Sequence, residues 1–78
     1  EISLSKNKTY KEIYLNLGYI FLLKKEYSRA EINLKKAISL DPDYIKAYEN
    51  LLLLNQLTNN LDQVSFYSNK IYKLVKQK

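Results

Sequence analysis

Residues 14–42 read YLNLGYIFLLKKEYSRAEINLKKAISLDP, and this stretch decides the fold. In its first half large apolar side chains recur at i, i+3 and i+7, and in its second half small and apolar side chains recur at i, i+4 and i+7. The positions are Tyr14, Leu17 and Phe21, then Ala30, Leu34 and Ala37. Each set forms one stripe of a helix. The stretch therefore predicts two antiparallel helices that share a seam.

Small residues lie at or beside this predicted seam. Gly18 stands next to it, and Ala30 and Ala37 stand within it. Without bulky side chains at these positions the two backbones can approach closely, while the large apolar residues fill the remaining volume. We expect a leucine at Gly18 or Ala30 to overpack the seam and to cost roughly 1–3 kcal/mol.

The order of these residues resembles the tetratricopeptide repeat, a helix-turn-helix unit with a period of about 34 residues. Gly18, Ala30, Ala37 and Pro42 match the family pattern unchanged, and Tyr14, Phe21 and Leu34 stand where the family usually has Trp, Tyr and Phe. The resemblance implies an all-α fold of antiparallel helix-turn-helix repeats, with about four helices in a chain of this length.

A shift by one period predicts a second copy of the unit. It superimposes identical residues at several positions, among them Tyr14 with Tyr48 and Leu17 with Leu51. Leu52 replaces Gly18, however, and Lys76 falls where the proline should recur. We therefore expect residues 9–43 to form one repeat and residues 44–78 to form a degenerate second repeat with a closing helix. Residues 1–8 are expected to be the end of a preceding repeat or an N-terminal extension.

Turn-forming residues predict where the helices end. The expected helices span residues 9–24, 28–40 and 44–57, followed by a closing helix that extends to about residue 76. The polar run from Ser5 to Thr9 is expected to be a turn. The expected helix caps are side chains that can accept a backbone N–H: Asn7 or Thr9, Ser28, Asp41 or Asp43, and Asp62.

Composition restricts the chemistry of the chain. It has 78 residues, a formal net charge of +5, and neither Cys nor His, so thiolate chemistry and the usual zinc ligand sets are excluded and no cofactor is expected. The longest apolar run, residues 13–23, is about half the length that a membrane-spanning helix needs. No segment identifies a compartment, and a soluble, cytoplasmic protein is the expectation.

The resemblance also implies where a partner would bind. In such repeats the first helix of each unit lines a concave groove that holds an extended peptide or a helix of another protein. Side chains of the two first helices that the seam does not use are the candidates for this groove: Glu12, Leu15, Asn16, Tyr19, Lys46, Glu49, Asn50 and Leu53. The expected function is that of a non-catalytic protein-interaction scaffold.

Composition and motifs also bear on nucleic-acid binding, catalysis and self-association. Single-stranded RNA binding is the alternative, because the chain is basic and has eight Tyr, but nucleic acid is the less expected partner. Catalysis is not expected, because the carboxylates are scattered and no nucleophile or phosphate-binding motif is present. Self-association is also expected, because two repeats are fewer than stability usually needs, and neighbouring repeats or a second copy would cover the open flanks.

Overall fold

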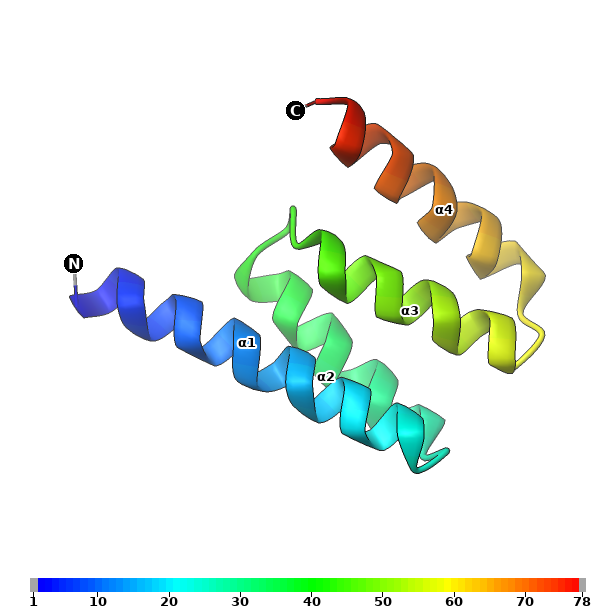
Figure 1. Ribbon diagram of the computed structural model, residues 1–78, viewed down its shortest axis with the longest axis horizontal. Helices are drawn as coiled ribbons and strands as arrows, with labels where there is room; N and C mark the ends of the chain where they lie inside the picture. Colours follow the sequence, from blue (N-terminus) through cyan, green and yellow to red (C-terminus); the bar gives the residue numbers. More distant parts are fainter. Residues whose placement is uncertain (1, 78) are drawn as a thin grey trace.

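The computed structural model describes the backbone of residues 2–77 and the side chains of residues 10–77. This part of the chain holds four helices and no strand: α1 (Ile2–Leu23), α2 (Tyr27–Leu40), α3 (Ile45–Leu57) and α4 (Leu61–Lys76). Successive helices run in opposite directions and form two helix-turn-helix pairs (Figure 1). The all-α prediction is confirmed, and the limits of α2 and α3 agree with the predicted ones to within one residue.

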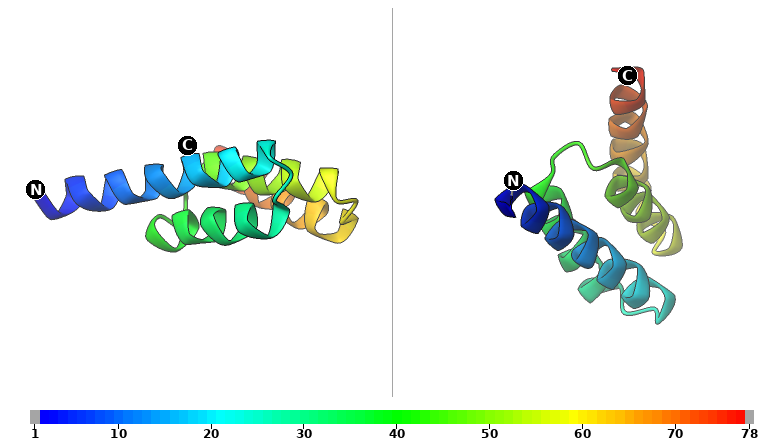
Figure 2. Two further views of the ribbon diagram at one scale, coloured as in Figure 1. Left: turned by 90° about the horizontal axis from the view of Figure 1, so that it is seen from below. Right: turned by 60° about the vertical axis from the view of Figure 1, so that its left-hand side comes forward.

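The four helices form a thin slab. α1 packs on α2, both of them contact α3, and α4 packs on α3. α2 lies beneath α1 in the left view of Figure 2, and α1 and α4 occupy opposite edges of the molecule in Figure 1. The Cα atoms span 41 × 31 × 14 Å, so the slab is only about two helices thick. A slab this thin leaves much of each helix surface in solvent.

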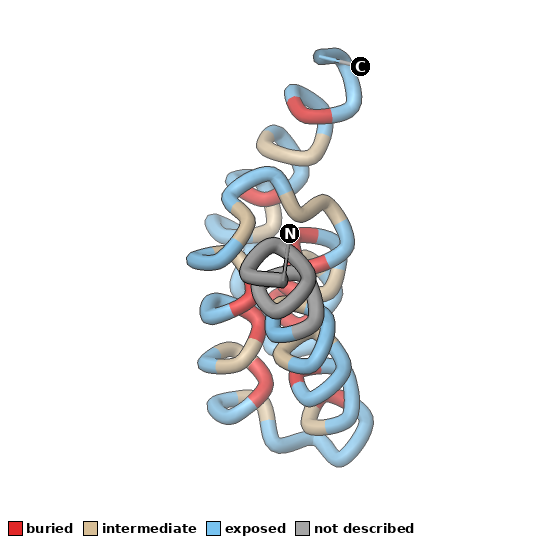
Figure 3. Tube along the Cα trace, turned by 90° about the vertical axis from the view of Figure 1, so that its left-hand side faces the viewer, coloured by how far each residue is buried: buried red, intermediate tan, exposed pale blue. Residues whose placement is uncertain are grey.

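The seam between α1 and α2 is a close contact at the core of the molecule. A Cβ atom added to Gly18 would lie 2.6 Å from both Cγ and Cδ2 of Leu34 and 3.3 Å from the carbonyl oxygen of Ala30. Ala30, Leu34 and Ala37 have no exposed area. Figure 3 shows that buried residues gather on the faces that the helices turn toward one another. The predicted close approach at small residues is therefore present.

The turns that end α1 and α3 have the same geometry. Each contains one residue in the left-handed region, Lys25 with φ 65° and Asn59 with φ 62°. In each turn the next N–H donates to a carbonyl five residues earlier, at 2.9 Å from Glu26 to Phe21 and at 2.8 Å from Asn60 to Asn55. This is the hydrogen bond of a Schellman motif, which satisfies carbonyls that the helix end leaves free. The turn therefore recurs after one period of about 34 residues.

The corner between α2 and α3 is held by polar contacts from α1 and from α3 itself. Pro42 follows the end of α2, where it lacks the N–H that a continuing helix needs. The Lys11 ammonium of α1 forms an ion pair with the Asp41 carboxylate. The Tyr48 hydroxyl of α3 donates a hydrogen bond of 2.8 Å to the carbonyl oxygen of Pro42. The corner thus ties α1, α2 and α3 together.

The predicted side-chain caps are wrong for the three helices whose start the structure describes with side chains. The N-cap residues are Glu26, Tyr44 and Asn60, and none of them makes a side-chain cap hydrogen bond. Ser28 lies inside α2 because the Schellman turn ends at the residue before Tyr27. The Asp41 carboxylate instead accepts the Asp43 N–H at 3.1 Å and pairs with Lys11. Asp62 lies in the first turn of α4, where its negative charge interacts favourably with the helix dipole.

The predicted turn at residues 5–9 is also wrong, because α1 is continuous from Ile2. Polar residues such as Ser, Asn and Lys cost only a few tenths of a kcal/mol each inside a helix, and no Gly or Pro interrupts this segment. The side chains of Asn7 and Thr9, the expected caps, lie outside the described residues. The assignment of residues 1–8 to an earlier repeat or an extension stays a prediction.

Candidate functional site

The candidate groove residues lie on two helices that contact each other, α1 and α3. Six of the eight have exposed side chains: Glu12, Asn16, Tyr19, Lys46, Glu49 and Leu53. On each helix the three exposed candidates are spaced by three or four residues, so each set lies on one helix stripe. We call these six residues the α1–α3 surface.

The other two candidates are partly buried. Leu15 packs against the hydrophobic core, and Asn50 is half-buried on α3. Leu22, which also faces away from the seam with α2, is fully in the core. These leucines fill the space between α1 and α3, so their apolar surface is used for folding.

An electrostatic contact links the two helices at one end of the α1–α3 surface. Burial raises the pKa of the Tyr44 phenol, and the nearby Glu12 carboxylate raises it further. Lys11 counteracts this effect, and its ammonium lies 4.4 Å from the centre of the Tyr44 ring. The start of α3 therefore lies within electrostatic reach of α1, and Glu12 is held beside it.

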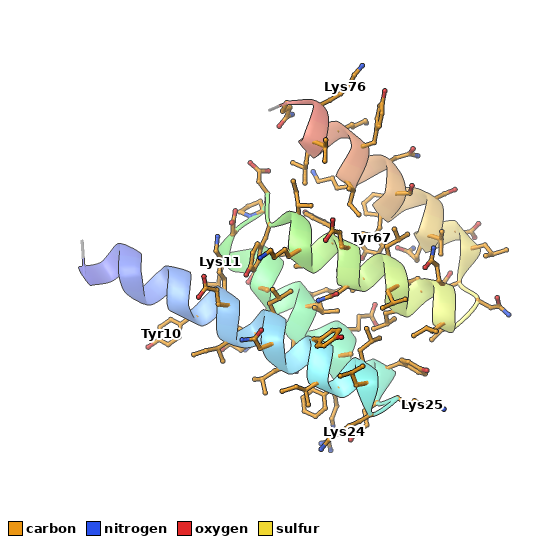
Figure 4. All side chains as sticks on the ribbon, viewed as in Figure 1. Tyr10, Lys11, Lys24, Lys25, Tyr67 and Lys76 are labelled. Atoms are coloured by element: carbon orange, nitrogen blue, oxygen red, sulfur yellow. The ribbon has the colours of Figure 1, made fainter. Side chains whose placement is uncertain are left out.

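Two further tyrosines belong to the core. Burial raises the pKa of the Tyr48 phenol, with Asp43 adding to the shift. Burial likewise raises the pKa of Tyr67, which points from α4 toward α3 (Figure 4). The two rings are tilted by 42° with their centres 6.1 Å apart, a geometry typical of stabilising aromatic pairs. These tyrosines stabilise the α3–α4 contact.

Acidic side chains are spread over the described surface, and several form ion pairs. Glu26 pairs with Arg29 at 3.5 Å and Glu31 with Lys35 at 3.2 Å, in addition to the pair of Asp41 with Lys11. Among the described residues, no group of three His, Cys, Asp or Glu side chains is placed to hold a metal ion. Nor does any helix in the described range have the length and hydropathy needed to cross a membrane.

Comparison with known families identifies the first helix pair. Residues 12–44 match the family model of the tetratricopeptide repeat, from the start of the predicted groove on α1 to the corner before α3. This segment is a tetratricopeptide repeat. The match contains the close approach at Gly18 and the proline that follows α2, two of the features from which the sequence predicted it. No curated protein and no solved structure matches the chain.

Tetratricopeptide repeats generally mediate protein–protein interaction and are typically non-catalytic modules. The matched segment carries the α1 half of the α1–α3 surface and ends before α3. The assignment of residues 44–78 to a degenerate second repeat stays a prediction, which the shared turn geometry supports.

The sequence analysis missed two surface features. A shallow depression on α4 is lined by Phe66, Asn69, Lys70 and Lys73, away from the α1–α3 surface. The second feature is an apolar face of α1 that points away from the other helices, as Tyr10 does in Figure 4. Its residues, Tyr10, Ile13, Leu17 and Ile20, are spaced by three and four residues, a pattern that was available in the sequence. Of these four residues, the sequence analysis assigns only Leu17 to a contact, the seam with α2.

Proposed function

We propose that this chain is a protein-interaction module that binds a segment of a partner protein across the α1–α3 surface. The observation that carries the proposal is the tetratricopeptide repeat at residues 12–44, whose first helix presents exposed side chains beside those of α3. The family's general role in protein–protein interaction supports the class of partner. We also propose that residues 44–78 act as a degenerate second repeat.

The side chains of this surface suit a peptide better than a small molecule. Tyr19 and Leu53 are exposed apolar groups one period apart, and each can contact an apolar side chain of the partner. Asn16 is exposed beside Tyr19, and its amide can both donate to and accept from a peptide backbone. Glu12, Lys46 and Glu49 supply charges at the margins. The proposed ligand is therefore an extended or helical segment with apolar anchors and free backbone groups.

We infer that the module has no catalytic activity of its own. General acid-base catalysis needs titratable groups that converge in a pocket. In the described part of the chain the depression on α4 offers an amide and two lysines beside an aromatic ring, and no carboxylate lines it. This inference rests on the chemistry of the side chains and on the typical role of the repeat.

The test is a binding screen of the 78-residue chain against an array of degenerate 12-residue peptides. Peptides that the parent binds should bind the double variant Tyr19→Ala/Leu53→Ala at least about tenfold more weakly, because two apolar contacts are lost. Ile32→Ala is the control, since Ile32 is also an exposed apolar residue but lies on α2. Equal weakening by the control, or no weakening by the double variant, would refute the site.

The alternative of single-stranded RNA binding is tested with the same proteins. Basic and aromatic side chains do alternate on α4, where Lys76 lies 5.5 Å from the centre of the exposed Tyr72 ring. A gel shift with single-stranded RNA that weakens steeply with salt, together with no peptide captured, would favour RNA over a protein partner. We expect the opposite pattern.

A further inference from the structure

The two helix pairs of this chain share several detailed contacts. The Schellman turn recurs after one period, and so does a cation–π contact: Lys36 lies 5.4 Å from the Tyr14 ring centre, and Lys70 lies 5.8 Å from that of Tyr48. Residues one period apart can therefore be compared as structural counterparts. The comparison shows which faces of the outer helices lack a neighbour.

α1 exposes an apolar face whose counterpart on α3 is buried. We call Tyr10, Ile13, Leu17 and Ile20 the outer stripe of α1; the last three are 45%, 36% and 45% exposed. One period later stand Ala47, Leu51 and Leu54, which are 0%, 0% and 4% exposed. Leu51 and Leu54 belong to the hydrophobic core, and α3 contacts both α1 and α2 of its own chain. The outer stripe is thus the surface with which such a helix packs on a preceding helix pair.

α4 exposes apolar side chains whose counterparts on α2 are packed. Leu61 and Tyr72 are 69% and 62% exposed. Their counterparts, Tyr27 and Ile38, are partly buried against the core. We call Leu61 and Tyr72 the receiving face of α4. Phe66 is not part of this face. Its counterpart on α2, Ile32, is exposed as well, so Ile32 does not take part in the contact between α3 and the α1–α2 pair.

We propose that the outer stripe of one copy of this chain docks on the receiving face of a second copy. The docked arrangement repeats the contact that α3 already makes with the α1–α2 pair, so the internal contact serves as its template. Ser68 stands where α2 has the buried Leu34. The contact between copies therefore buries less apolar surface than the internal one and forms only as concentration rises.

The geometry of this contact determines the type of assembly. The two docking faces are different surfaces, so the contact is heterologous, and each docked copy keeps one free face of each kind. Association then continues head to tail instead of stopping at a symmetric dimer. Because the surfaces are apolar and the chain carries a net charge of +5, added salt should not weaken the association.

The test is sedimentation of the 78-residue chain over a wide concentration range. The stripe variant is Ile13→Lys/Ile20→Lys, the receiving variant is Leu61→Lys/Tyr72→Lys, and the control is Ile32→Lys/Phe66→Lys. All six positions are exposed, so each variant should keep the helical circular dichroism of the parent. The parent and the control should gain mass steadily with concentration. Each docking variant alone should associate at least about tenfold more weakly.

Mixing the two docking variants gives the decisive result. The intact stripe of the receiving variant can dock on the intact receiving face of the stripe variant, and no face then remains for a third copy. An equimolar mixture should therefore form a one-to-one dimer and stop there. A receiving variant that still dimerises alone would show a symmetric α1–α1 contact and overturn the proposal. So would a parent that stays monomeric at the highest concentration, or a control that loses association.

Discussion

Replacing Gly18 by alanine should destabilise the chain, although the same change favours an isolated helix. Alanine is better than glycine inside a helix by roughly 1 kcal/mol. Against this, the new Cβ would lie 2.6 Å from Cγ and Cδ2 of Leu34, where carbon atoms normally stay about 3.5–4.0 Å apart. Leu34 has no exposed area and its Cγ is close to the backbone, so it cannot move aside freely. Overpacking of this kind costs about 1–3 kcal/mol, which outweighs the helix term.

The expected net loss is about 1 kcal/mol in the free energy of unfolding, measured by urea titration with circular dichroism. The helix term can be measured separately in the same helix at the exposed Asn16, by comparing Asn16→Gly with Asn16→Ala. A double-mutant cycle with Leu34→Ala isolates the contact itself. In that background the methyl group at position 18 should be tolerated or should fill part of the cavity. Two results would contradict a steric clash between position 18 and Leu34. One is that Gly18→Ala stabilises the chain as much as alanine does relative to glycine at position 16. The other is that the effects of Gly18→Ala and Leu34→Ala on the free energy of unfolding are additive.

Two further changes test the turns and the corner. Lys25→Gly should stabilise the chain by about 0.5–1 kcal/mol, since lysine is strained in the left-handed region. Asn59→Gly should stabilise it by a smaller amount, because asparagine tolerates that region. Equal gains in the free energy of unfolding, measured by urea titration, would contradict this. Tyr48→Phe should cost about 1 kcal/mol by removing the hydrogen bond to Pro42. Burial raises the pKa of Tyr48 and of Tyr67 in the folded chain above the ordinary phenol pKa of about 10, so their contribution to stability is complete below about pH 10 and is lost as the pH rises through the folded-state pKa values. The alkaline loss of stability, followed together with phenolate absorbance, should be smaller in Tyr48→Phe than in the parent.

The helices and their seam could be predicted because strong local signals coincide. The single glycine and the single proline of the chain stand at positions where few other residues would fit, one against Leu34 and one after the end of α2. The periodicity of apolar residues then places each helix between polar turns. Such signals depend on residues near in sequence, which a single chain displays directly.

The residues that precede and cap the helix starts could not be predicted, because the deciding conformation has no marker in the sequence. Lys25 adopts the left-handed region without being glycine, and this moves the start of α2 ahead of Ser28. Asp41 offered a cap, but its carboxylate is engaged by Lys11, a partner thirty positions away. Contacts between distant residues override local preferences here.

The candidate site was only partly predictable for a related reason. Spacing by three and four residues defines a stripe on a helix but not the neighbour that covers it. Leu15 was placed in the groove and packs in the core, while Leu17 was placed in the seam and lies largely on the outer edge.

The corner at Pro42 has a consequence for the shape of any surface that spans both helix pairs. Lys11 from α1 and Tyr48 from α3 both contact this corner, so opening it would break an ion pair and a hydrogen bond. Movement of one pair relative to the other is therefore opposed both at this turn and in the apolar core that the pairs share. A surface that spans both pairs is thereby fixed in shape.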